Sequence, residues 1–269
     1  MNNQQRRTGS QTPTFVWAGA IFAVGFLLLP LIGLVKQVAW SSVLSSVTSG
    51  PASAALRLSL ATSIAATVIA LLLGLPLAWV LARVAFRGRS IVRALVMLPM
   101  VLPPVVGGVA LLSAYGRTNG LVGGWLYDFF GVQLTFSPAG VVIAEAFVAL
   151  PFLVMSVESG LSSLDPRFEE SAATMGIGPV RRFWTVTLRL LLPSLVAGVA
   201  VAWARALGEF GATITFAGNI EGRTQTTPLA VYLLLENDPK AAYALSFVLL
   251  AVCVVVLVAM RDRWLGRRS

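Results

Sequence analysis

The segment EESAATMGIGPVRRFWTVTLRLLLP, residues 169–193, interrupts a chain that is otherwise mostly apolar. It combines two acidic residues, several small residues, a Gly-Ile-Gly-Pro turn and paired arginines, and it ends in a run of leucines followed by proline. Glycine and proline are the strongest local signals of a turn. The segment therefore predicts two helices joined by a corner, the second of which continues into the next apolar segment.

The composition of the whole chain indicates a membrane protein. Hydrophobic residues make up 57% of the 269 residues, and charged residues only 12%. Soluble domains contain about 45–50% apolar and about 25% charged residues. We therefore predict an all-α, polytopic protein whose main solvent is the lipid bilayer. The net charge of +9 does not indicate nucleic-acid binding, because the arginines lie beside apolar segments and form no stripe on a soluble domain.

Hydropathy predicts the number of spans. A helix needs about 20 mostly apolar residues to cross a bilayer. Six segments reach or approach this length, at about 15–36, 55–83, 94–114, 138–158, 187–207 and 241–260. The apolar segment 227–235 is too short to span and is expected to be interfacial or re-entrant. Nothing indicates a second domain, so we expect a single transmembrane domain over residues 1–269.

The distribution of positive charge predicts the orientation, since lysine and arginine in short loops favour the cytoplasmic side. With a cytoplasmic N-terminus, the outer segments contain only Lys36, Arg57, Arg117, Arg223 and Lys240. Apart from Arg205 inside the fifth span, all other arginines then fall on the cytoplasmic side. We therefore predict a multi-pass protein of the cell membrane with both termini in the cytoplasm.

Prolines interrupt the third predicted span at Pro99, Pro103 and Pro104. Each proline removes a backbone hydrogen bond and bends a helix. A broken helix at membrane depth persists only where protein or a water-filled cavity satisfies the freed carbonyl groups. Two interpretations stay open, a bent helix that lines a pathway and a kink that improves packing.

Three ionisable residues lie in or beside the predicted spans. Glu145 and Arg205 both fall roughly 10 Å below the outer surface of the hydrocarbon core. Glu209 follows Arg205 by one helical turn, so either acid could pair with the arginine. One interpretation is a buried ion pair that fixes helix packing. The other is an arginine that helps an oxyanion to pass, because guanidinium offers several donors in a fixed geometry.

The region about 162–189 is predicted to form a cytoplasmic loop of two helices. Asp165 suits an N-cap, Gly176 suits a helix C-terminus, and Pro179 suits the start of the second helix. The small residues at 171–173 leave a surface over which a partner's groove could close. An amphipathic helix lying at the membrane interface is equally compatible with these residues.

This loop resembles the coupling loop of importer-type ABC permeases, in which Glu-Ala-Ala is followed after three residues by glycine. Here Glu170-Ser171-Ala172 is followed after three residues by Gly176. Ser171 replaces the first alanine, and Arg189 stands where the family usually has proline. The resemblance implies that the contact with a cytoplasmic ATPase involves Glu169, Glu170, Ser171, Ala172, Gly176, Ile177, Gly178 and Pro179.

Three further segments resemble molybdate ABC permeases: MLPMVLPPVVGGVALL (97–112), ARALGEFGATITFAGN (204–219) and TQTTPLAVYLLLE (224–236). GEFGAT followed by TFAG is specific to the molybdate and sulfate group. The resemblance implies the type I ABC importer permease fold, a homodimer, two copies of a cytoplasmic ABC ATPase and an extracytoplasmic molybdate-binding protein. A permease for sulfate, thiosulfate or tungstate is the alternative.

The chain itself is not expected to be an enzyme. A phosphate-binding loop needs the pattern G-x-x-x-x-G-K-[ST], and the only two lysines follow Val35 and Pro239. Histidine is absent, so no histidine-based metal site is expected. ATP and magnesium would be bound by the partner ATPase, whose closure would move the loop and produce alternating access. A secondary transporter acting alone is the rival, but the coupling loop would then lack a purpose.

Overall fold

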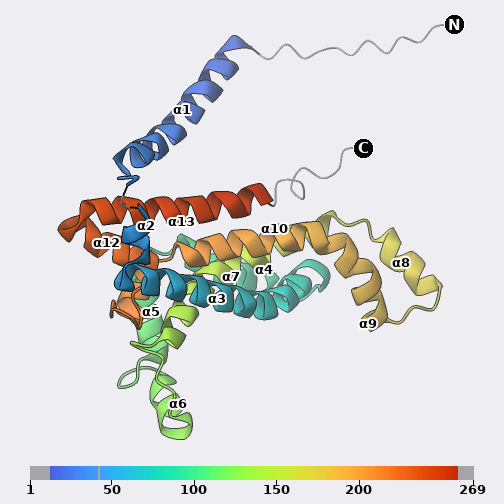
Figure 1. The fold of residues 1–269 in the computed structure, drawn as a ribbon. Coiled ribbons are helices and arrows are strands. Elements are labelled where there is room, and N and C mark those ends of the chain that lie inside the picture. The colour runs from blue at the N-terminus through green and yellow to red at the C-terminus, as the bar shows by residue number, and fades with distance from the viewer. Residues whose placement is uncertain (1–12, 42, 260–269) are drawn as a thin grey trace, which may run out of the picture.

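The computed structural model describes residues 13–41 and 43–259. Within these ranges the regular structure consists of helices, and no strand occurs (Figure 1). The prediction of an all-α protein is therefore confirmed. Both termini and the last residue of the sixth predicted span lie outside the described residues, so the cytoplasmic position of the two ends stays a prediction.

Within the described residues, five helices are long and apolar enough to cross a membrane. They are α1 (Thr14–Gln37), α3 (Gly50–Arg83), α7 (Pro138–Ser163), the continuous helix Pro179–Leu207 and α13 (Pro239–Ala259). Each coincides with one of the spans that hydropathy predicts, which confirms five of the six.

The third predicted span is broken into two helices. α4 (Arg89–Val101) and α5 (Pro104–Tyr115) meet at an angle of 116°. Leu102 between them is extended, with φ −64° and ψ 138°. A residue that precedes proline is pushed out of the helical region by steric clash, so the adjacent Pro103 explains the break. The pair is a broken span or a re-entrant loop, which corrects the expectation of one bent helix.

Shorter helices occupy the connections. They are α2 (Val43–Thr48), α6 (Gly123–Phe130), α8 (Arg167–Thr174), α11 (Gly211–Phe216) and α12 (Thr227–Asn237). The continuous helix consists of α9 (Pro179–Arg182), the π-helical segment η1 (Phe183–Thr187) and α10 (Leu188–Leu207). α12 contains the short apolar segment of the sequence and, as expected, is too short to span.

The core of the bundle lies between α3, α7 and α10. Its fully buried residues are small or aliphatic, among them Ala70, Ala149, Leu153 and Ala202. A methyl group added to Gly74 of α3 would stand 3.0 Å from Leu153 Cδ2 of α7. Small residues let helices approach closely, and close packing is a main source of helix association in lipid. These three helices therefore form the frame that carries the other elements.

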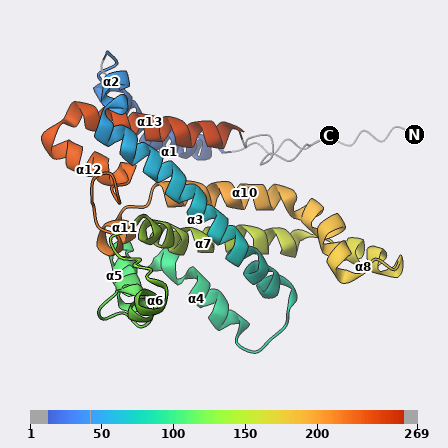
Figure 2. The same cartoon turned by 60° about the horizontal axis from the view of Figure 1, so that its bottom comes forward.

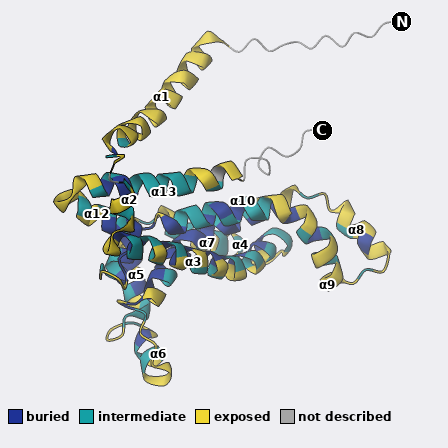
Figure 3. Ribbon diagram, in the orientation of Figure 1, coloured by how far each residue is buried: buried dark blue, intermediate teal, exposed yellow. Residues whose placement is uncertain are grey.

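The bundle has two distinct ends (Figures 1 and 2). One end carries α8 and α9 beside the last turn of α3, and we call it the α8 end. The opposite end carries α5, α6, α11 and α12, and we call it the α12 end. α1 projects from the bundle and has no buried residue, as Figure 3 shows. The long helices α3, α7 and α10 are therefore the physical connection between the two ends.

Candidate functional site

α8 and its turn form the first part of the candidate site. The helix begins at Arg167 with Pro166 in the N-cap position, so Asp165 lies one residue before the cap that the sequence predicts for it. The Arg167 backbone N–H still donates to Asp165 Oδ1 at 2.9 Å, within the turn that precedes the helix. Gly176 ends the helix with φ +78°, and the Ile177 N–H donates to Ala172 O at 3.1 Å. This left-handed conformation is easy for glycine alone. The expected glycine-ended helix is confirmed.

The residues that the resemblance selects do not all face the same way. Glu170, Ser171, Gly176, Gly178 and Pro179 are exposed, whereas Ala172 is buried. Three apolar residues of this loop, Phe168, Met175 and Val180, are 56%, 72% and 72% exposed. Several exposed apolar side chains in one short segment are typical of a surface that a partner covers. Glu169 is half-buried and turns back toward the bundle.

Glu169 links three separate elements. Its Oε1 lies 3.3 Å from Arg83 Nη2, at the end of α3. The same oxygen accepts a hydrogen bond from the Thr187 hydroxyl at 2.9 Å, at the end of η1. Thr187 is buried. Glu169 therefore joins α8 both to α3 and to the helix that continues into α10. The sequence gives no signal for the roles of Arg83 and Thr187.

The π-helical segment η1 is a local irregularity at the point where α8 is attached. π-Helical turns are rare and occur mainly at functional positions. The ring of Phe183 in η1 packs against Trp79 of α3, with centroids 5.2 Å apart. The segment is thus held on one side by an aromatic contact and on the other by Glu169. Nothing in the local sequence predicts a π-helix here.

A second ion pair reinforces the α8 end. Arg93 of α4 pairs with Glu158 of α7 through two of its nitrogens, and the Arg93 Nε–Glu158 Oε1 distance is 3.1 Å. This pair ties the first half of the broken span to the frame. Neither residue is singled out by the sequence, because the pairing depends on how α4 packs against α7.

Arg205 lies at the α12 end, in the last turn of α10. Its Nη2 is 2.6 Å from Glu209 Oε2. The other oxygen of Glu209 accepts a hydrogen bond from the Ala212 N–H at 2.8 Å, at the start of α11. The Glu209 side chain is 1% exposed, but that of Arg205 is 29% exposed. Of the two acids that could pair with the arginine, Glu209 is the one that does.

Glu145 has a different partner. Its Oε1 accepts a hydrogen bond from the Thr62 hydroxyl of α3 at 3.0 Å. Its second oxygen has no hydrogen-bond partner among the described residues. Glu145 therefore links α7 to α3 inside the frame, and the alternative in which it pairs with Arg205 is not observed.

The broken span and Arg205 meet at one cavity. It has a volume of about 100 Å³ and is lined by residues that include Pro99, Pro104, Phe152 and Arg205. Pro103 caps α5 beside it. A water molecule takes up about 30 Å³ of liquid volume, so the cavity is large enough for a small anion. The proline-rich break and Arg205, which the sequence analysis treats separately, are thus adjacent in space.

Gly211 shows how tightly this region is assembled. A methyl group on Gly211 of α11 would stand 2.6 Å from Pro104 Cβ of α5. The close approach holds α11, and with it Glu209, against the second half of the broken span. Among the described residues no group of three His, Cys, Asp or Glu side chains could hold a metal ion.

Membrane-length helices around a small cavity, a broken span and an exposed helix outside the bundle define a multi-pass membrane transport subunit. Residues 70–267 match the family model of the binding-protein-dependent transport system inner membrane component. The chain belongs to this family, which also places it in the inner membrane.

Relatives and solved structures refine this assignment. The chain is 49% identical over 160 residues to the molybdenum transport system permease protein ModB of Mycobacterium tuberculosis, covering 60% of each chain. It is 40% identical over 156 residues to the sulfate transport system permease protein CysT of Escherichia coli, covering 58% of this chain and 56% of that protein. A chain of a bacterial alginate ABC transporter, crystallised with its alginate-bound periplasmic protein, has a TM-score of 0.74 and 17% identity over 94% of both chains. The type I ABC importer permease fold is confirmed.

Proposed function

We propose that this chain is the membrane-spanning subunit of an ATP-driven importer for molybdate. The proposal rests on the family, on the 49% identity to a molybdenum permease, and above all on the attachment of the exposed helix α8 to two long helices through Glu169. In the working complex two copies of this chain would associate with two cytoplasmic ABC ATPases and one extracytoplasmic molybdate-binding protein.

The orientation follows from the charges. Arg83, Arg87, Arg89, Arg93, Arg181 and Arg182 all belong to segments at the α8 end. Short basic loops favour the cytoplasm. The α8 end therefore faces the ATPases, and the α12 end faces the binding protein.

Transport would proceed by alternating access. Closure of the ATPases displaces α8, and Glu169 passes this displacement to Arg83 on α3 and to Thr187 at the start of α10. α10 spans about 30 Å at 1.5 Å per residue, and its far end carries Arg205. A movement imposed at the α8 end thus changes the cavity at the α12 end without any covalent chemistry in this chain.

Arg205 would bind the passing oxyanion weakly. Its guanidinium offers donors in a planar arrangement that suits tetrahedral oxyanions. Glu209 already occupies one side of that guanidinium and competes with the anion for it. This competition keeps the site from trapping the substrate, so selectivity would lie mainly in the external binding protein.

The test is transport by the reconstituted complex. This chain, its ATPase and its binding protein are placed in lipid vesicles, and ATP hydrolysis and uptake are measured with molybdate, tungstate, sulfate or no anion. The proposal is supported if molybdate stimulates both ATP hydrolysis and uptake and sulfate stimulates neither. Stimulation by sulfate would reassign the substrate to the alternative that the similarity to CysT suggests. Uptake by this chain alone, without ATP, would contradict the proposal.

A further inference from the structure

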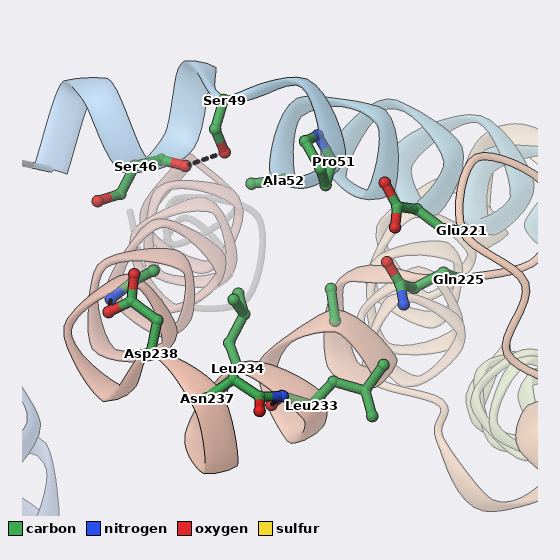
Figure 4. Close-up of a pocket in the computed structure, with 12 residues that line it drawn as sticks. Ser46, Ser49, Pro51, Ala52, Glu221, Gln225, Leu233, Leu234, Asn237 and Asp238 are labelled. Carbon is green, nitrogen blue, oxygen red and sulfur yellow. Dashed lines mark hydrogen bonds between the residues drawn. The ribbon is translucent and has the colours of Figure 1, made fainter.

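A second cavity opens at the α12 end, away from Arg205. It has a volume of about 420 Å³ and lies between the start of α3, the preceding α2 and the hairpin of α12 and α13 (Figure 4). The loop before α12 contributes Glu221 and Gln225 on one side, and Asp238 stands on the other. None of the transport steps described above uses this pocket.

The charged residues that line the pocket are all negative. Glu221 and Asp238 are both exposed carboxylates, and the lining contains no lysine or arginine. Asp238 uses one oxygen to accept the Ala241 N–H at 3.2 Å, which caps α13. Glu221 makes no ion pair among the described residues. The electrostatic field at the mouth therefore favours a cation.

Gln225 provides independent support for a ligand. Only 8% of its surface is exposed, and its side chain lines the pocket. Its backbone N–H donates to Ile220 O at 3.0 Å, and no hydrogen bond joins its side-chain amide to another described residue. The amide atoms are not among the fully enclosed polar atoms of the described residues, so they are reached through the pocket. The amide can accept from and donate to a group that enters the pocket.

The rest of the lining is apolar. Pro51 and Ala52 of α3 and Leu233 and Leu234 of α12 form walls between the polar groups. Lysine and arginine bury their aliphatic stems against apolar surfaces while their charged ends reach polar partners. Apolar walls beneath a carboxylate rim are the surroundings that such a side chain requires.

We propose that this pocket receives a lysine or arginine side chain, presented on a loop of the extracytoplasmic binding protein. The proposal rests on the proposed function, which places the α12 end outside the cell and requires a binding protein to dock there. The inserted cation meets Glu221 at the mouth and the Gln225 amide inside, and its stem packs against Leu234. Since Glu221 is exposed, its attraction acts before contact and speeds association, and salt weakens it.

The experiment measures direct binding of the fluorescently labelled binding protein to the complete permease–ATPase complex in nanodiscs. The variants are Glu221→Lys and Gln225→Leu. The matched control is Glu236→Lys, because Glu236 is an exposed carboxylate on α12 that does not line the pocket. We expect Glu221→Lys to weaken binding about tenfold and to reduce its salt dependence. The Glu236→Lys control should stay within about twofold of the unchanged complex.

Cross-linking identifies the inserted side chain. With Cys253 replaced by serine, Gln225→Cys is labelled with a thiol-reactive photo-cross-linker, which captures either a lysine or an arginine loop, and the linked peptide of the binding protein is sequenced. A single linked loop containing a basic residue supports the proposal. Reversing the charge of that residue should restore the binding lost in Glu221→Lys.

Equal affinities for Glu221→Lys and Glu236→Lys would overturn the pocket proposal. The outcome is separate from that of the proposed function. If the complex binds its binding protein through the pocket but imports sulfate, the pocket proposal stands and only the substrate of the proposed function is reassigned. A complex that binds no binding protein contradicts both.

Discussion

The α8 end and the α12 end both contain a glutamate paired with an arginine, but the two pairs are built differently. Arg83 and Glu169 join two helices far apart in sequence, and their side chains are 23% and 22% exposed. Arg205 and Glu209 are one turn apart, and Glu209 is completely enclosed and also holds the start of α11. The α8 pair is thus a link between elements, whereas the α12 pair fixes a local arrangement around a cavity.

This difference has an energetic consequence. A partly exposed ion pair contributes little stability by itself, so the Arg83–Glu169 pair is suited to carry movement without locking the bundle. At the α12 end only Glu209 is enclosed, and removing Arg205 is more costly because it leaves that buried carboxylate without its cation. Substitutions at the α8 end should therefore affect coupling, and those at the α12 end should affect both stability and passage.

The largest effect is expected from Gly176→Pro. Proline cannot adopt the φ of +78° and removes the N–H that donates to Ala173 O at 3.0 Å, which together cost more than about 3 kcal/mol locally. The α8 turn should be lost, and ATP hydrolysis should continue without uptake. Gly50→Ala is the control, because Gly50 lies outside this loop at the start of α3 and has open space around it. Normal uptake by Gly176→Pro would remove α8 from the coupling mechanism.

The next effect is expected from Arg205→Gln. The substitution leaves the buried Glu209 carboxylate without its cation, and we expect a loss of about 2–3 kcal/mol, reduced from a fully buried pair by the exposure of Arg205. Uptake rate, coupled hydrolysis and dimer content are measured together. Slow uptake by an intact, hydrolysing dimer indicates a role in passage. Dissociation of the dimer indicates a purely structural role, and Arg57→Gln provides the control for loss of an outer arginine.

Glu169→Gln tests the ion pair with Arg83 at the α8 end. The substitution removes the charge that attracts Arg83, and energetic coupling between distant sites typically changes by about 0.5–2 kcal/mol in such variants. The number of ATP molecules hydrolysed per anion imported should rise. The exchanged pair Arg83→Glu with Glu169→Arg should bring this ratio back toward the original. A ratio that is the same in all variants would show that the link carries no movement.

The smallest effect is expected from Thr62→Val. It removes the hydroxyl that donates to Glu145 between α3 and α7, and hydrogen bonds between membrane helices contribute about 1 kcal/mol. The unfolding temperature should fall slightly, while Thr62→Ser, which keeps the hydroxyl, should match the original chain. If Thr62→Val unfolds at the same temperature as the original chain, the hydrogen bond between Thr62 and Glu145 does not stabilise the bundle.

Local signals in the sequence were sufficient for the long helices and for the end of α8. Hydropathy located α1, α3, α7, α10 and α13, because a membrane span must be apolar over its whole length. The prolines at 99, 103 and 104 marked the third span as irregular, and Gly176 located the end of α8, because each residue restricts or frees its own backbone. These features depend only on neighbouring residues.

Tertiary structure decided which of these residues meet. The choice of Glu209 rather than Glu145 for Arg205, the bond of Thr187 to Glu169, and the meeting of Pro104 with Arg205 at one cavity all depend on how the long helices pack. Residues far apart in sequence come together only after many small side chains have set the distances between α3, α7 and α10. The sequence alone therefore determined the spans, the irregularity of the third span and the exposed loop, whereas the tertiary structure determined the break between α4 and α5, the link at the α8 end and the cavity at the α12 end.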